Sequence, residues 1–317
     1  MRRICWVVFL TVCWNIYGAI AQTETPWRRF EFTHPQMGTV FRLIFYARTD
    51  TLTATGWAKA AFDAVDSLNA AMSDYIPESE LSRLSQYAGI GQFVPVSRDL
   101  WQVLKISEGF SRKSEGAFDV TIGPLTRLWR RARNVKELPD SARISTALQS
   151  VGYTQLIVGP RQRILLNRPG MRLDLGGIAQ GYAADRCLQI LRKFGVKRAM
   201  TDAGGDIALG KPPPGKKGWD IEVSGSPGQR LFLSKCGITT SGASYRYLEV
   251  DGKRYSHIVD PRTGWGLTHR VLVTVQAKDA TTADAWATAI SVLGKTGWLQ
   301  LKHKPKGVTV WLTEENW

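Results

Sequence analysis

Apolar residues recur every three or four positions along several stretches of the chain, a spacing that predicts amphipathic helices. The clearest stretch covers residues 56–72, where Trp57, Val65 and Leu68 belong to the apolar face. The polar residues 73–85 follow it and are expected to form a loop. The same spacing predicts helices over residues 100–114, 141–151, 178–193 (ending before Gly195) and 282–293.

Other stretches favour strands, either because apolar and polar residues alternate, as in residues 271–277, or because short apolar runs are bounded by turn residues. These strands are expected at residues 41–46, 155–158, 163–166, a segment ending at Leu175, 198–201, 219–224, 231–234, 254–259, 271–277 and 307–312. Residues 155–158 and 163–166 pair naturally as a hairpin. Because strands cluster in runs instead of alternating strictly with helices, we expect an α+β fold with mixed or antiparallel sheets and packed helices.

The N-terminus has the pattern of an export signal. Met1, Arg2 and Arg3 precede an apolar run over residues 4–16, and Ala19 and Ala21 supply the small side chains that a signal peptidase needs. We therefore expect residues 1–21 to be a signal peptide, residues 22–317 to be one domain, and the mature protein to be periplasmic. Val12 stands before Cys13, which argues against a lipoprotein, and an uncleaved membrane anchor is the less favoured alternative.

Charge and cysteine content narrow the classes of partner and site. The formal net charge of +15 falls by two when the leader's arginines are removed, and it favours anionic partners: a nucleotide, an acidic protein or a membrane surface. Residues 127–136 place Trp129 among basic residues, but a solvated helix face is favoured over a nucleic-acid site. Cys187 and Cys236 remain after cleavage, and without a Cys-x-x-Cys pair a structural zinc site is disfavoured; two buried thiols are preferred to a disulfide.

Two segments of small residues beside carboxylates are candidate phosphate or metal sites. Residues 171–185 carry Asp174 into the glycines 176 and 177 and then open a helix, so bare backbone and a carboxylate meet at a helix N-terminus. Residues 201–206 again place two glycines between Asp202 and Asp206. Each pattern is also compatible with an ordinary tight turn.

Two further segments carry reactive side chains. Asp284 and Thr288 lie four residues apart on an expected helix, so oxygens of both can reach one hard cation such as Mg²⁺. Taken alone, a structural role is favoured, in which Asp284 complements the helix dipole and the Thr288 hydroxyl bonds to the carbonyl of residue 284. His257, at a strand end before a Pro-containing turn, can relay a proton near neutral pH or serve as a structural hydrogen-bonding group. Residues 210–217 are not a P-loop, because Lys217 replaces the metal-binding hydroxyl and three prolines interrupt the loop.

Taken together and in order, these segments resemble the ApbE family of FAD:protein FMN transferases, over the stretch from Met37 to Leu293. The resemblance rests on residues 37–39, 72–75, 79–82, 116–125, 173–179, 203–206, 240–242, 257–264 and 283–285. It implies an ApbE-like, T-fold-related architecture. It also implies an enzyme that splits FAD at its pyrophosphate, moves FMN to a Ser or Thr hydroxyl of a partner flavoprotein, and releases AMP.

The resemblance also assigns residues to roles. It implies that His257 transfers a proton. It also implies that the carbonyl of Gly177 and the side-chain oxygens of Asp284 and Thr288 bind Mg²⁺. The flavin nucleotide would be lined by Met37, Tyr75, Ala117, Phe118, Asp119, Asp174, Gln180 and Ile258, with Tyr75 and Phe118 able to stack on its rings. Gln180 stands where many relatives carry Lys, and Asp202 where Asn is usual.

The alternatives that remain are an FAD pyrophosphatase, giving FMN and AMP, and a non-catalytic exported flavin-binding module. We expect no nucleic-acid partner. Association with a membrane surface, through the basic charge or through a partner, stays open.

Overall fold

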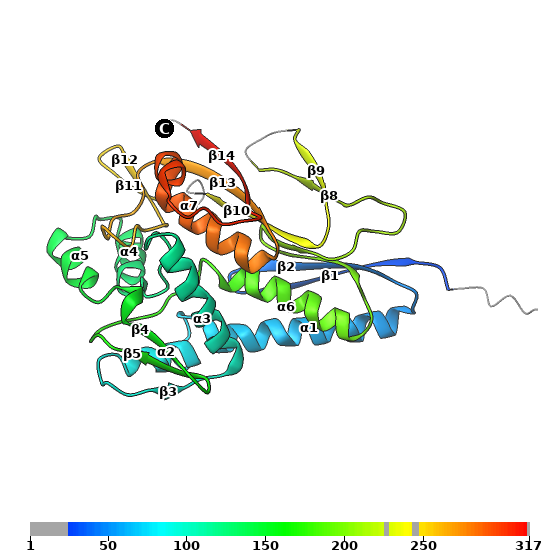
Figure 1. Ribbon diagram of the computed structural model, residues 1–317, viewed down its shortest axis with the longest axis horizontal. Coiled ribbons are helices and arrows are strands. Elements are labelled where there is room, and N and C mark those ends of the chain that lie inside the picture. Colours follow the sequence, from blue (N-terminus) through cyan, green and yellow to red (C-terminus); the bar gives the residue numbers. More distant parts are fainter. Residues whose placement is uncertain (1–24, 225–227, 243–246, 316–317) are drawn as a thin grey trace, which may run out of the picture.

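The computed structural model describes residues 25–224, 228–242 and 247–315, so the expected signal peptide, residues 1–21, lies outside the described residues. Among the residues it does describe, none of the helices combines the length and apolarity that a bilayer crossing needs. Helices pack on antiparallel sheets, which confirms the expected α+β class (Figure 1).

Within the described residues the centre is a seven-stranded sheet in the order β1-β2-β6-β7-β10-β13-β14, with neighbouring strands antiparallel. The strands are β1 (Arg28–Gln36), β2 (Thr39–Ala47), β6 (Arg198–Ala203), β7 (Asp206–Leu209), β10 (Cys236–Gly242), β13 (Arg270–Ala277) and β14 (Thr309–Glu315). The sequence analysis did not predict β1, β7 and β10. The interior strand β10 carries Thr239, Thr240 and Ser241, so it lacks the apolar run that would have identified it from the sequence.

Three long helices cover one face of this sheet: α1 (Thr51–Met72), α6 (Ala179–Lys193) and α7 (Ala280–Gln300) (Figure 1). Glycines set how closely they approach. A Cβ on Gly181 would lie 2.4 Å from the Ala280 carbonyl oxygen, and one on Gly237 of β10 would lie 2.1 Å from the Ala280 nitrogen. Only glycine permits these contacts, and they press the start of α7 against both α6 and β10. The helix expected at 282–293 is longer than predicted and kinks at Gly294, whose φ is +63°.

The opposite face of the sheet carries a smaller apolar cluster that includes Met200, Trp219 and Ile238. Trp219 belongs to a two-stranded ribbon of β8 (Trp219–Glu222) and β9 (Arg230–Leu233). Both strands lie in regions where the sequence analysis predicted strands.

The remaining elements gather mainly at one end of the sheet (Figure 1). They are α2 (Glu80–Gln86), β3 (Val94–Pro95), α3 (Arg98–Lys113), α4 (Gly123–Val135), α5 (Ser141–Leu148), the 3₁₀ turn η1 (Tyr153–Gln155), β4 (Leu156–Gly159), β5 (Arg163–Leu166), β11 (Tyr247–Val250) and β12 (Lys253–Ser256). The hairpin expected from residues 155–166 is confirmed as β4 and β5.

Two expectations are wrong. The stretch 73–85 is not all loop, because α2 begins within it: the Ser79 hydroxyl accepts a hydrogen bond from the Ser82 amide, and Leu81 and Leu84 are buried. The strand expected to end at Leu175 is reduced to an isolated bridge at Arg172, because this segment pairs with only one residue of the loop before α4.

The basic stretch 127–136 belongs to α4, with Arg127 and Arg131 exposed. Trp129 is fully buried, and its indole N–H donates to the Gly264 carbonyl oxygen at 2.9 Å. The tryptophan is therefore part of the core and offers no stacking face to a nucleic acid. Cys187 is buried, and both it and Cys236 are free thiols, as expected.

Candidate active site

Asp284 and Thr288 of α7 face the glycine-rich turn that opens α6. The Asp284 carboxylate accepts a hydrogen bond from the Gly181 amide at 3.1 Å. Thr288 lies one turn further along α7. A Cβ on Gly177 would lie 2.8 Å from the Thr288 hydroxyl oxygen, so the Gly177 main chain packs directly against the Thr288 side chain. The structure thus places Gly177 beside the helix turn that carries Asp284 and Thr288, although more than a hundred positions separate Gly177 from either residue in the sequence.

The Asp206 and Asp284 carboxyl groups near this contact are buried, so ionising them without a cation is costly. Burial, together with the charge of Asp206, raises the pKa of Asp284 well above its ordinary value. Burial raises the pKa of Asp206 to about 7, and the charge of Asp202 adds to that shift. In the part of the chain that is described, no basic side chain lowers the pKa of Asp206 or of Asp284.

These features fit a small hard cation, which would neutralise Asp284 and prefers oxygen ligands. Among the described residues, no three His, Cys, Asp or Glu side chains meet at one point. A cation here would therefore depend on hydroxyl and main-chain oxygens as well as on Asp284, which is the donor set that Thr288 and Gly177 provide.

Another carboxylate, Asp185 on α6, holds the start of α7 in place. It accepts hydrogen bonds from the amides of Ala280 and Thr281, at 3.1 and 2.9 Å, and from the Thr281 hydroxyl at 2.6 Å. Burial raises its pKa to about 6. The sequence analysis missed this residue, because nothing in its own segment indicates that it caps a helix almost a hundred residues away.

The hairpin turn between β1 and β2 lies beside the start of α6. The Gln180 side-chain amide donates to the Met37 carbonyl oxygen at 3.1 Å, and Met37 adopts a left-handed backbone with φ +52°. A second turn meets the same hairpin, because a Cβ on Gly204 would lie 2.2 Å from the Thr39 hydroxyl oxygen. Asp202 accepts a hydrogen bond from the Gly205 amide and so stabilises that turn.

Asp174 and Tyr75 meet at Arg130 of α4. One guanidinium nitrogen donates to Asp174 at 2.7 Å, another donates to Asp74, and the guanidinium carbon lies 4.1 Å from the Tyr75 ring centroid. The other Asp174 oxygen accepts from the Gly176 amide at 2.8 Å. The sequence analysis did not select Arg130 or Asp74. Arg130 is one of several cations in a basic run, and its local sequence does not distinguish it from the exposed ones.

Ala117, Phe118 and Asp119, which the resemblance assigns to the flavin nucleotide site, are all buried. The Phe118 ring is 3% exposed and packs edge-on against Phe110, with centroids 6.0 Å apart. Core residues cover most of the Phe118 ring, and its stacking on a flavin ring stays a prediction. The Asp119 carboxylate accepts from the Thr121 amide and hydroxyl, and from the Tyr153 amide.

Ile258 packs with Ala117, Leu267 and Val292, and Val292 lies one turn beyond Thr288 on α7. The segment that carries Ile258 is thus placed next to the same helix that carries Asp284. His257 precedes Ile258 and is partly buried. The structure therefore places the segment that carries Ile258 beside α7 and Ala117.

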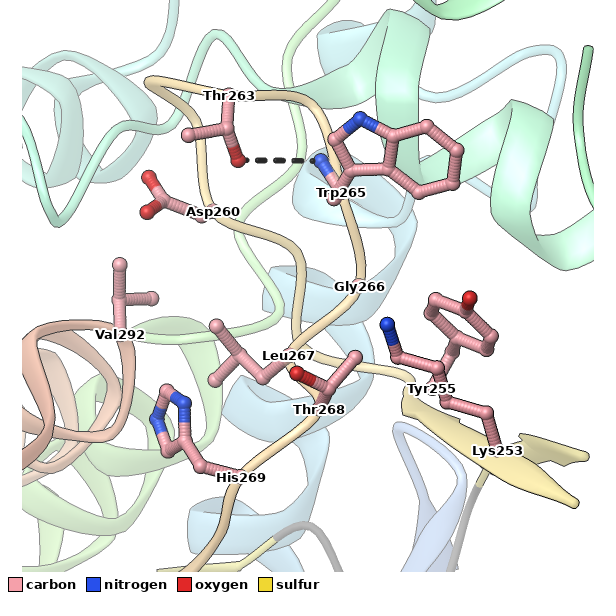
Figure 2. Close-up of a pocket in the computed structure, with 10 residues that line it drawn as sticks. All are labelled: Lys253, Tyr255, Asp260, Thr263, Trp265, Gly266, Leu267, Thr268, His269 and Val292. Carbon is pink, nitrogen blue, oxygen red and sulfur yellow. Dashed lines mark hydrogen bonds between the residues drawn. The ribbon is translucent and has the colours of Figure 1, made fainter. Parts of the chain in front are cut away.

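A cavity of about 400 Å³ opens beside this region, between β12, the loop after Asp260 and α7. Figure 2 shows Val292 and Leu267 facing one another, and Tyr255 and Lys253 on the other side of the loop. The cavity is lined by charged, aromatic and aliphatic side chains, and it adjoins the Ile258 segment because Leu267 donates its amide to the Ile258 carbonyl.

Comparison with known proteins gives one consistent answer. Residues 37–312 match the ApbE family. An FAD:protein FMN transferase of Klebsiella pneumoniae is 32% identical over 270 residues, covering 84% of this chain and 83% of that protein. One from Treponema pallidum is 31% identical over 319 residues, covering 93% and 87%.

Solved structures agree with the sequence relatives. The ApbE protein of Thermotoga maritima superposes with a TM-score of 0.80 at 30% identity, covering 90% of this chain and 94% of that one. A histidine-to-glycine variant of the flavin transferase ApbE from Vibrio cholerae gives 0.80 at 28% identity, covering 91% and 94%.

Proposed function

The chain belongs to the ApbE family, and from that premise we propose that it is an FAD:protein FMN transferase whose acceptor is a Ser or Thr hydroxyl of a partner flavoprotein. In this reaction the acceptor oxygen attacks the phosphorus that carries the flavin side of FAD. The bond from that phosphorus to the bridging oxygen breaks, AMP leaves with the oxygen, and the acceptor loses its proton.

The observation that carries the proposal is the contact between α7 and the glycine turn. Asp284, Thr288 and the Gly177 carbonyl are the groups that would hold Mg²⁺. When bound, this ion would reduce the charge repulsion between an attacking oxygen and the dianionic pyrophosphate. Burial keeps water away from Asp284, which strengthens its attraction for a cation.

The other residues bind, orient and accept the proton. Tyr75 offers an exposed ring, and Met37, Gln180 and Ile258 line the surroundings of the nucleotide. We assign to His257 the role of general base that takes the proton from the acceptor hydroxyl, because an imidazole side chain can relay a proton near neutral pH. A general base of this kind increases the reaction rate by about 10²- to 10⁴-fold.

We further propose that the protein works outside the cytoplasm, with residues 1–21 as its signal peptide. The acceptor would then be an exported flavoprotein. The excess of basic residues supports approach to an acidic partner or to an anionic membrane surface.

The test is to incubate the mature chain with FAD, MgCl₂ and candidate exported flavoproteins, and to search each by mass spectrometry for an added FMN on Ser or Thr. AMP should appear in equal amount. Asp284→Ala should abolish transfer in a folded protein, whereas Asp63→Ala, on the exposed side of α1, should not change it.

Two results would contradict the proposal in different ways. FMN and AMP released at the same rate without any acceptor would identify a pyrophosphatase. Stoichiometric FAD binding without turnover, in the presence of Mg²⁺ and every acceptor, would identify a flavin-binding module.

A further inference from the structure

Arg130 lies at the centre of a cluster of contacts, and the proposed reaction assigns Arg130 no role. Its guanidinium donates to both Asp74 and Asp174 and covers one face of the Tyr75 ring. The Arg130 side chain is only 22% exposed, and that of Asp174 is 8% exposed. Contacts of this kind are stronger than surface ion pairs, because one planar guanidinium donates hydrogen bonds to two partly buried carboxylates.

The cluster joins three segments that are far apart in the chain. Asp74 and Tyr75 follow the end of α1, Arg130 is on α4, and Asp174 begins the glycine-rich turn before α6. Without Arg130, two carboxylates would face each other in a partly buried position. The pKa of Asp74 is already raised by burial and by the charge of Asp174, so the guanidinium is what keeps the two acids together.

Tyr75 differs from the other aromatic residues of the site. It is 70% exposed, whereas Phe118 is buried. With Arg130 against one face, the ring leaves open area for a second ring. An exposed tyrosine that is held in one orientation loses less conformational entropy when a ligand stacks on it, and a cation over the ring adds an attractive contact.

We infer that Arg130 is a positioning residue for FAD: it fixes the Tyr75 ring and the Asp174 carboxylate so that an aromatic ring of the dinucleotide stacks on Tyr75. This inference rests on the proposed function, because it takes FAD as the ligand. Arg130 is assigned no contact with the reacting phosphorus, so its effect should fall on FAD binding and not on the chemical step.

The test compares Arg130→Met, which keeps length but removes charge, with Arg130→Lys, which keeps charge but loses the planar fork. Arg131→Met is the matched control, since Arg131 is the next residue on α4 and is exposed. FAD is titrated without acceptor, by quenching of its flavin fluorescence, and KM and kcat are then measured with acceptor. Thermal unfolding confirms that each variant is folded.

We expect Arg130→Met to weaken FAD binding and to raise the KM for FAD by about tenfold, with kcat at saturating FAD changed by less than about threefold. Arg130→Lys should lose about threefold in affinity, and Arg131→Met should match the wild type. If the Met variant unfolds, the Lys variant carries the test, and unchanged affinity in a folded Lys variant overturns the inference.

A double-mutant cycle identifies Tyr75 as the residue through which Arg130 acts. In a Tyr75→Leu background, adding Arg130→Met should weaken FAD binding by much less than about tenfold, because the ring it positions is already gone. A full tenfold additional loss of FAD affinity in the Tyr75→Leu background would overturn the inference. A lower kcat for Arg130→Met with unchanged FAD affinity would overturn it too. Wild-type protein that fails to bind FAD would refute the proposed function itself, whereas wild type and Arg130→Met binding FAD equally would refute only the role of Arg130.

Discussion

Replacing Asp284 with Asn separates the two roles that the structure gives this side chain. Asn has nearly the same shape and keeps an oxygen that can accept the hydrogen bond from the Gly181 amide, which is 3.1 Å long in the wild type. The substitution removes only the charge. That charge is buried next to Asp206 and has no basic partner in the described residues, so its loss should not harm the metal-free fold.

The magnitude follows from ligand linkage. Mg²⁺ at about 100 times its dissociation constant would stabilise the wild type by about 2.7 kcal/mol. At an unfolding entropy of about 2.1 cal/mol/K per residue, each kcal/mol moves the Tm of a chain of this size by about 1.6 °C, so Mg²⁺ should raise the wild-type Tm by about 4 °C. Asp284→Asn should show no such rise. Asp284→Ala should show none either, and should be about 1–3 kcal/mol less stable than Asp284→Asn, because the Gly181 N–H loses its acceptor.

The assay is thermal unfolding in EDTA and in MgCl₂, with Asp63→Asn as a control that removes an exposed carboxylate of α1. The wild-type shift should shrink as pH falls, because burial raises the pKa of Asp284 and a proton then competes with the cation. A Mg²⁺-dependent rise in Tm that persists in Asp284→Asn would refute the assignment of Asp284 as a ligand. A wild-type Tm that does not change when Mg²⁺ is added would refute it as well.

Three further predictions come from single contacts. Gly177→Ala would place a methyl group 2.8 Å from the Thr288 hydroxyl, so we expect a loss of about 1–3 kcal/mol in unfolding free energy and a fall in FMN transfer, measured by denaturant titration and by initial rates. Gly56→Ala, in the interior of α1 with nothing within 4 Å of the new methyl, should instead stabilise the protein by about 0.5–1 kcal/mol and leave transfer unchanged; lower stability would contradict it. Because burial raises the folded-state pKa of Asp185 to about 6, above its value of 3.8 in the unfolded chain, this group's contribution to stability is largest below pH 4 and is lost as pH rises through 6. The unfolding free energy of Asp185→Asn minus that of the wild type should therefore increase by about 2 kcal/mol between pH 4 and pH 7, and a flat difference would show that burial does not shift the pKa of this group.

Local sequence determined the helices well and some strands poorly. The helices over residues 56–72, 100–114 and 178–193 were identified because each buries an apolar stripe whose spacing is visible in the sequence. β10 was missed because a strand at the centre of a sheet gets its stability from hydrogen bonds to both neighbours, and here its hydroxyl-bearing residues give no apolar alternation. The short helix α2 was missed because two buried leucines are too few to establish a period.

The candidate site likewise has features that local sequence predicts and contacts that it does not predict. The sequence by itself determined the family and the pieces of chemistry: a carboxylate and a hydroxyl four residues apart, and glycines beside carboxylates, since helical spacing and backbone freedom are local properties. Only the tertiary structure decided that Gly177 meets Thr288, that Asp185 caps α7, and that Arg130 joins Asp74 to Asp174. These contacts join segments tens to more than a hundred residues apart. The packing of the whole chain brings them together, and no local pattern records which distant partner a side chain will find.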